Sequence, residues 1–112
     1  NLGEKIIKKL KNLSKFYNIK MYISEMPSII KFGFVSKNDL NYKTLITQEM
    51  LKKNILATSS IYISCAHDQK ILNKYFVCLK KIFYMIKKCE NGQDINNYLD
   101  VPAAKKFFNR LN

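Results

Sequence analysis

A stripe of apolar residues, spaced three and four positions apart, occupies positions 71–86 and constrains the fold more than any other feature of this sequence. The spacing predicts a long helix with one buried face, because residues three and four apart lie on the same side of a helix. Asp68 is suited to cap its first turn, and Gly92 to end it. The stripe consists of Ile71, Leu72, Tyr75, Phe76, Leu79, Ile82, Phe83 and Ile86. Such a helix needs a second layer of structure to cover this face.

Two further segments, 2–17 and 42–53, show the same helical spacing. Asn18 should end the first helix. Asn54 should end the second, because asparagine is the usual substitute for glycine in the left-handed conformation that a helix end favours. The apolar residues are Leu2, Ile6, Ile7, Leu10, Leu13 and Tyr17 in the first segment, and Tyr42, Leu45, Ile46 and Met50 in the second. We therefore expect three main helices.

The residues around these helices set their boundaries. Asn38 and Asp39 form a turn whose side chains are suited to cap the second helix. Pro102 stands at a helix-start position before an apolar segment, so a short terminal helix is expected over 103–111.

Alternating apolar and polar residues predict three strands, at 19–24, 30–34 and 61–65. The segment from Glu25 to Ser28 should end the first strand and separate it from the second, since Pro27 cannot donate a hydrogen bond to a sheet. Two strands with such a short connection indicate an antiparallel pair. The apolar positions of the strands are Ile19, Met21 and Ile23, then Ile30, Phe32 and Phe34, then Ile61, Ile63 and Cys65.

These elements predict an α+β fold. We expect a small, mainly antiparallel sheet of three or four strands, with helices packed on one face, in the order α-β-β-α-β-α plus a short C-terminal helix. Residues 1–92 should form the domain and 93–112 a C-terminal extension. The chain has no initiating Met, and the first helical pattern has begun by Leu2. We therefore expect a fragment of a longer protein.

The net charge of +12 raises the question of nucleic-acid binding. Nineteen of the twenty basic residues are lysines, Arg110 is the only arginine, and the lysines are spread along the chain. Arginine makes the two-pronged contacts to bases and phosphates, so this composition argues against a nucleic-acid partner. No apolar segment approaches the roughly 20 residues of a membrane span. Three cysteines without a CxxC pair indicate buried thiols and a cytoplasmic protein.

The residues alone show little catalytic chemistry. His67 is the only histidine, and its neighbour Asp68 is better used as a helix cap, so His67 has no evident base or metal partner. Ser59 and Ser60 suit either a substrate-contacting loop or an ordinary turn. The three glycines form no phosphate-binding pattern. No metal site is expected, and this reading ends at a small α+β domain.

The segment TQEMLKKNILATSSIYISCAHDQKILNKY, residues 47–75, resembles the C-terminal part of class III pyridoxal-phosphate-dependent aminotransferases, in the glutamate-1-semialdehyde aminomutase-like branch. In that branch a helix ends at a glycine, here Asn54. A short apolar run follows, here Ile55 to Ala57, and an Ala-His pair, here Ala66-His67, opens the last long helix. The resemblance covers roughly Ile19 to Cys89.

The resemblance implies the small C-terminal domain of a fold-type I enzyme, which closes over the substrate. The large domain upstream would hold pyridoxal phosphate on a Schiff-base lysine, and the full-length enzyme would be a cytoplasmic homodimer that takes an amino donor and a carbonyl substrate. None of the nineteen lysines can be assigned as that lysine, so this chain alone should be inactive, with no catalytic or cofactor-binding residue of its own. Thr58, Ser59, Ser60 and Tyr62 should lie near the substrate, while His67 and Asp68 should support the corner between strand and helix.

Two departures from the family pattern concern the substrate. Many class III enzymes carry an arginine in the third strand to bind a carboxylate, whereas this chain reads Ile61-Tyr62-Ile63-Ser64-Cys65. The preceding loop lacks the acidic residue of the aminomutases. Both absences favour a sugar-like or surface-polysaccharide precursor as substrate. The alternatives are a stand-alone basic α+β domain that binds nucleic acid, and an interaction domain that reuses this fold without chemistry.

Overall fold

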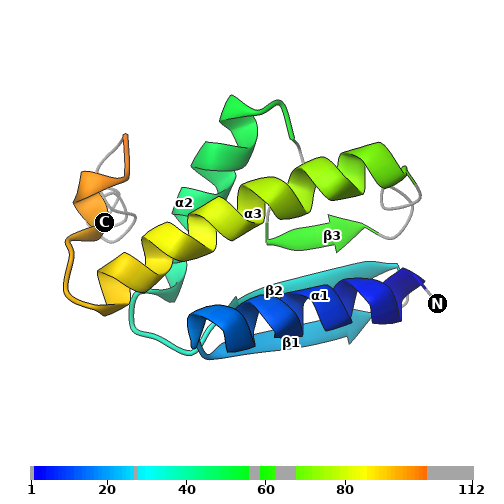
Figure 1. Cartoon of the computed structure of the whole chain (residues 1–112), viewed down its shortest axis with the longest axis horizontal. Coiled ribbons are helices and arrows are strands. Elements are labelled where there is room, and N and C mark those ends of the chain that lie inside the picture. Colours follow the sequence, from blue (N-terminus) through cyan, green and yellow to red (C-terminus); the bar gives the residue numbers. More distant parts are fainter. Residues whose placement is uncertain (1, 27, 56–58, 63–67, 101–112) are drawn as a thin grey trace, which may run out of the picture.

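The computed structural model describes residues 2–26, 28–55, 59–62 and 68–100. The elements are α1 (Leu2–Tyr17), β1 (Met21–Met26), β2 (Ile29–Phe34), α2 (Asp39–Lys52), β3 (Ser60–Tyr62), α3 (Gln69–Glu90) and the 3-10 turn η2 (Ile95–Asn97), as Figure 1 shows. The predicted α+β class and element order are confirmed. The expected helix at 103–111 lies outside the described residues.

Most of the predicted helix ends are confirmed by the backbone. Asn18 and Asn54 adopt positive φ angles of 53° and 58°, as expected of residues that end α1 and α2. Gly92 has a φ of 114° just after α3. At the start of α3, the Asp68 carboxylate accepts hydrogen bonds from the backbone N–H groups of Lys70 and Ile71. Local sequence chemistry therefore sets these four boundaries.

The predicted cap of α2 is wrong. The Asn38 side chain makes no capping hydrogen bond. Asp39 instead turns back to the sheet, where its Oδ1 accepts a 2.7 Å hydrogen bond from the backbone N–H of Phe34. The end of β2 leaves this N–H in need of an acceptor, and Asp39 supplies it. The helix start is therefore tied to the strand before it rather than to its own first turn.

The sheet has the strand order β1-β2-β3, and both pairs are antiparallel. The first strand begins at Met21, later than predicted, and it continues through Glu25 to Met26, where an interruption was expected. Pairing up to Met26–Ile29 leaves a two-residue connection, so the interruption is shorter than the sequence suggested. Ile61 of β3 is buried as predicted, whereas Ile63 and Cys65 lie outside the described residues.

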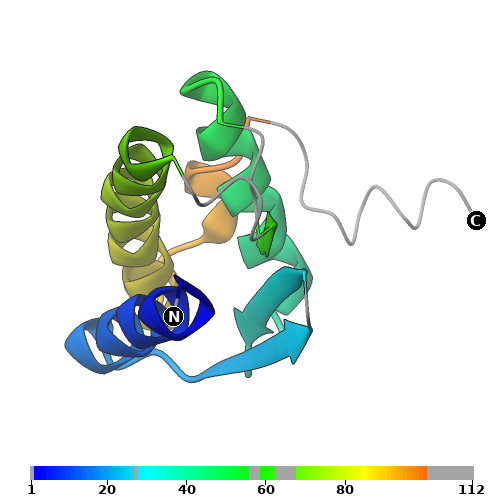
Figure 2. The same cartoon turned by 90° about the vertical axis from the view of Figure 1, so that its right-hand side faces the viewer.

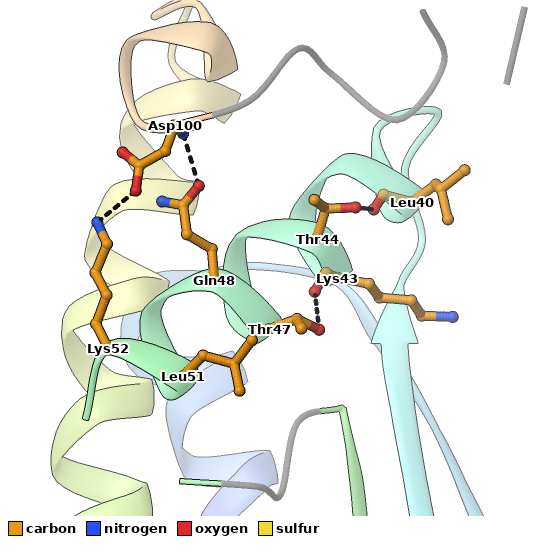
Figure 3. Close-up of a pocket in the computed structure, with 8 residues that line it drawn as sticks. All are labelled: Leu40, Lys43, Thr44, Thr47, Gln48, Leu51, Lys52 and Asp100. Atoms are coloured by element: carbon orange, nitrogen blue, oxygen red, sulfur yellow. Dashed lines mark hydrogen bonds and ion pairs between the residues drawn. The ribbon is translucent and has the colours of Figure 1, made fainter. Parts of the chain in front are cut away.

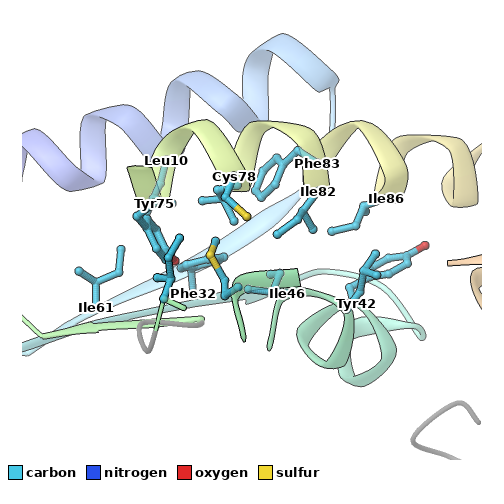
Figure 4. Packing of buried hydrophobic residues seen from close by; sticks show 14 of the residues in the cluster. Leu10, Phe32, Tyr42, Ile46, Ile61, Tyr75, Cys78, Ile82, Phe83 and Ile86 are labelled. Carbon is cyan, nitrogen blue, oxygen red and sulfur yellow. The ribbon is translucent and has the colours of Figure 1, made fainter. Parts of the chain in front are cut away.

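Helices cover one face of this sheet. In Figures 1 and 2, α1 and α3 run side by side over it, and α2 packs against α3 and β2. Strand β2 supplies Ile30, Phe32 and Phe34 to the core, as the alternation predicted. Figure 4 shows side chains of α3, among them Ile82 and Ile86, pointing toward α2 and the sheet. Among the helices of the described residues, none has the length and apolar character needed to cross a membrane.

Phe34 lies where three elements meet. Its ring centroid is 5.5 Å from that of Tyr42 on α2 and 5.6 Å from that of Phe83 on α3, both in edge-on geometry. Aromatic pairs at these distances add to the stabilisation that burial provides. The sheet, α2 and α3 therefore share one aromatic cluster.

One member of the predicted stripe is not in the core. Ile71 is 48% exposed, whereas Leu72, one position later, is buried. Ile71 lies in the first turn of α3, which projects past the end of β3 in Figure 1. Helical spacing identifies the buried side of a helix but does not show where the covering layer ends.

The apolar face of α3 should tolerate no charge. Ile82→Asp places a carboxylate at a fully buried position, and the cost of several kcal/mol is comparable with the whole stability of a domain, about 5 to 15 kcal/mol. We expect this variant to lose its cooperative thermal transition. Val77→Asp, at an exposed position of the same helix, should change stability by less than about 0.5 kcal/mol. A cooperative melt in Ile82→Asp would show that the buried face is misassigned.

The buried tyrosine Tyr42 should make the fold sensitive to alkali. Burial, and then its 2.5 Å hydrogen bond to Glu90, raise the pKa of Tyr42 above its ordinary range. Above about pH 10 the unfolded chain releases this proton while the folded chain keeps it, so the free energy of unfolding falls as the pH rises. We expect Tyr42→Phe to show a shallower fall in urea-denaturation experiments between pH 9 and 11.5 (about the range of phenol ionisation). Equal slopes for both proteins would contradict this.

Candidate functional site

The second face of the sheet has no described helix over it, as Figure 2 shows. Antiparallel partners lie on the same face, so the residues of this open face follow from the register. They are Tyr22, Ser24 and Met26 of β1, Ile29, Lys31 and Gly33 of β2, and Ser60 and Tyr62 of β3. Tyr62 is 55% exposed, and Met26 and Tyr22 are also exposed. We call this surface the open face.

The structure brings two of the predicted substrate-side residues together here. Ser60 pairs with Lys31, and Tyr62 pairs with Ile29, so both side chains belong to the open face. Ser59 is half-buried, and its carbonyl oxygen accepts a 3.0 Å hydrogen bond from Phe32 N–H. Thr58 and His67 lie outside the described residues. The corner residue Asp68 caps α3, as described above.

A polar network lies at one end of the open face. The Tyr22 hydroxyl donates to Asp39 Oδ2 over 3.1 Å and accepts from Lys43 Nζ over 2.6 Å. Lys43 Nζ also lies 3.3 Å from Asp39 Oδ2 and 5.2 Å from the Tyr22 ring centroid. The Tyr22 ring crosses directly over Gly33, where a Cβ would come within 2.2 Å of the ring. Glycine at this position therefore lets the ring reach α2.

A groove of about 720 Å³ runs along the outward side of α2 (Figure 3). It meets the open face at Lys43, which belongs to both the groove and the Tyr22 network. Its lining residues are Leu40, Lys43, Thr44, Thr47, Gln48, Leu51, Lys52 and Asp100. The Thr44 and Thr47 hydroxyls donate to carbonyl oxygens of their own helix, so they are already satisfied.

Gln48 fixes one wall of this α2 groove. Its Nε2 donates to the carbonyl oxygen of Tyr98 over 2.9 Å, and its Oε1 accepts from Asp100 N–H over 2.7 Å. Lys52 forms a 3.0 Å ion pair with the Asp100 carboxylate. The Gln48 side chain thus holds the backbone of Tyr98 and Asp100, which follows α3, against α2. These residues are about fifty positions from Gln48 in the sequence.

The charged groups of the Tyr22 network are already paired with one another, and the described residues bring no set of metal ligands together. The hydrogen bond to Tyr22 is the main cause of a raised Lys43 pKa, and Asp39 adds to it, so the ammonium group is charged but already engaged. Within the described ranges, no three His, Cys, Asp or Glu side chains gather closely enough to hold a metal ion. Burial raises the pKa of the Cys78 and Cys89 thiols, which disfavours a nucleophilic thiolate. The open face offers hydroxyl groups, aromatic rings and apolar contact area.

Sequence reasoning missed the roles of Tyr22, Asp39 and Lys43. Asp39 was expected to cap a helix, and Tyr22 and Lys43 carried no expectation of a site. Their contacts join residues 17 and 21 positions apart, which no local pattern reveals. The available signals were the four-residue spacing of Asp39 and Lys43 and a glycine within a strand.

Comparisons with known proteins identify no family. No protein-family model, no curated protein and no solved structure matches this chain.

The close contact between Tyr22 and Gly33 can be measured by a double-mutant cycle. Gly33→Ala forces the Tyr22 ring away from its hydrogen bonds, so it should destabilise the protein. In a Tyr22→Ala background the same change meets no ring and should cost much less. We expect a coupling of about 1 to 3 kcal/mol in urea denaturation. Additive effects of the two changes would show that the ring does not lie over Gly33 in solution.

Proposed function

We propose that this chain is the C-terminal small domain of a class III, pyridoxal-phosphate-dependent aminotransferase of the glutamate-1-semialdehyde aminomutase-like branch. One observation carries the proposal: the sheet is covered by helices on one face, and its open face bears Ser60 and Tyr62. The family resemblance implies a helix-covered antiparallel sheet that closes over a substrate. In this arrangement the open face meets an upstream domain that holds the cofactor.

The composition of the open face suits such contact. Tyr62, Met26 and Ile29 lie next to one another at one end of it, because Met26 pairs with Ile29 and Ile29 with Tyr62. Tyrosine and methionine are enriched where protein surfaces meet. An exposed apolar cluster on a sheet is costly to leave in water, and a second domain would cover it.

The described residues do not fit the cofactor by themselves, since the fixed cation Lys43 is already engaged by Asp39 and Tyr22. The proposal therefore assigns pyridoxal phosphate to the upstream domain, where it would serve as the electron sink for amino transfer. This chain would supply positioning and exclude water when the domain closes. Ser60 would hydrogen-bond to the substrate, and Tyr62 would pack beside it.

The substrate class follows from the polar groups on this face. Ser24 and Ser60 flank Lys31 on neighbouring strands, and β3 has no arginine. A carboxylate is usually bound by an arginine that makes two parallel hydrogen bonds to it, and the row formed by Ser24, Lys31 and Ser60 contains no arginine. Hydroxyl groups without a fixed cation suit a hydroxyl-rich substrate, such as a sugar-like or surface-polysaccharide precursor. Activity would require a homodimer, as the resemblance implies.

A matched pair of tyrosines tests this proposal. Tyr62 on the open face and Tyr84 on α3 are almost equally exposed, at 55% and 54%. In the protein that carries this chain with its upstream domain, Tyr62→Ala should lower kcat/KM for amino transfer by about tenfold or more, which is about 1.4 kcal/mol of transition-state binding. Tyr84→Ala should leave it unchanged, and both variants should keep the visible absorbance of bound pyridoxal phosphate.

Two results would overturn the proposal. One is a full-length protein that binds no pyridoxal phosphate. The other is equal activity in the Tyr62→Ala and Tyr84→Ala proteins. Loss of bound cofactor in Tyr62→Ala alone would also contradict the assignment of cofactor binding to another domain.

One observation favours the alternative of a nucleic-acid-binding domain. The sequence placed Phe32 and Phe34 in the core, and the structure confirms this, but Tyr22 and Tyr62 are exposed on the open face near Lys31. Exposed sheet aromatics stack on the bases of single strands. Titration with single-stranded and duplex oligonucleotides at two salt concentrations separates the two functions. Binding that falls steeply with salt and is lost in Tyr62→Ala supports the alternative.

A further inference from the structure

A second exposed feature lies on the helical side of the molecule, between α1 and α3, which run side by side (Figures 1 and 2). The groove between them measures about 610 Å³. We call it the α1/α3 groove, and its lining residues are Lys9, Asn12, Leu13, Phe16, Asn73, Phe76, Val77 and Lys80. None of them belongs to the open face or to the α2 groove.

The floor of the α1/α3 groove is apolar and exposed. Phe16 is 74% exposed and Val77 is 60% exposed, and Phe76, which lines the same groove, is only partly buried. Single exposed apolar residues are common, but a large aromatic ring and a branched aliphatic side chain in one concave surface mark an interaction site. The fold gives Phe16 no role in the core, because its neighbour Tyr17 makes the contact with Phe83.

The rim of the α1/α3 groove is positively charged. Lys9 Nζ lies 5.2 Å from the Phe76 ring centroid, and Lys80 Nζ lies 5.9 Å from that of Phe16. None of the eight lining residues is acidic. Helices α1 and α3 together carry eleven lysines against two acidic residues, Glu4 and Glu90. An acidic partner would therefore be attracted to this side of the molecule.

The charge and shape of the groove select its occupant. A second copy that docked through the same groove would bring Lys9 and Lys80 close to their own counterparts, and these like charges would repel each other. A phosphate backbone would use the lysines but gain nothing from the apolar side chain of Val77, which also lines the groove. A third helix fits a surface formed by two neighbouring helices, because helices pack at about 8 to 10 Å between axes with side chains in the groove.

We propose that the α1/α3 groove binds an acidic amphipathic helix of a partner protein. The apolar face of that helix would pack on Phe16, Phe76 and Val77. Its carboxylates would pair with Lys9 and Lys80, whose ammonium groups lie over the aromatic floor. This is the helix-in-groove mode of recognition, in which anchors three, four and seven positions apart provide most of the affinity. The site goes beyond the proposed aminotransferase function, since it lies on the helical side and does not depend on a cofactor.

The test uses the full chain and a defined probe. The probe is a fluorescent helical peptide of about 18 residues (five turns), with leucines on one face and glutamates beside them, and its twin has lysines in place of the glutamates. Fluorescence anisotropy should show binding of the acidic peptide and not of its twin. Phe16→Ser with Val77→Ser should weaken binding by at least about tenfold. Val35→Ser with Leu51→Ser changes two apolar residues that are exposed elsewhere and should have no effect.

A charge-matched control addresses the lysines. Lys9→Glu with Lys80→Glu should weaken binding of the acidic peptide more than Lys20→Glu with Lys37→Glu, which changes the net charge equally at exposed positions outside the groove. All the substituted side chains are on the surface, so thermal melts should show that the variants fold. Equal effects of the two lysine pairs, or no binding of the acidic peptide, would overturn the proposal. Anionic lipid vesicles or a single-stranded oligonucleotide that bound through Phe16 and Val77 more tightly than the peptide would overturn it as well.

Discussion

The burial of one face of β2 under the helices is the constraint on which the rest of this structure depends. β2 is the central strand, and it gives Ile30, Phe32 and Phe34 to the core. Phe34 joins the sheet to α2 and α3 through its contacts with Tyr42 and Phe83. The described helices α1, α2 and α3 all pack on the same side of the sheet, so none of them covers the opposite face of this strand. The open face is thus a direct consequence of how the core is built.

Local sequence patterns predicted most of this fold because they report short-range physics. Helical spacing identified the three main helices, and Asn18, Asn54, Asp68 and Gly92 marked their ends through backbone preferences that need no tertiary context. The predictions were wrong at positions whose contacts depend on residues outside the local segment. Asp39 does not cap α2 as predicted, because its carboxylate accepts a hydrogen bond from the backbone N–H of Phe34. Ile71 matches the helical stripe and is nevertheless exposed, because coverage depends on where neighbouring elements end.

The candidate site was predictable only in part for the same reason. Ser60 and Tyr62 share a face because residues two apart in a strand always do, but the sequence indicated a loop at Ser60 and a strand only from Ile61, whereas β3 begins at Ser60. The Tyr22 network depends on the register between β1 and β2, which brings Tyr22 opposite Gly33, and on the direction in which α2 leaves the sheet. Neither follows from local spacing. The pinning of Asp100 by Gln48 is likewise a contact between distant segments that carries no periodic signal.

Three residue types make up a large share of this chain. Lysine, asparagine and isoleucine together supply 45 of the 112 residues. Eight of the described isoleucines lie in the core, whereas the lysines remain on the surface, so a few residue types satisfy the pattern of apolar and polar positions that the fold requires. A fold can be specified in this way while residue identities diverge, because cores accept many combinations of similar volume. Gly33 is required on the open face by the Tyr22 ring above it, whereas Ser60 and Tyr62 contribute little to the buried volume, so the packing of the core does not fix their identities.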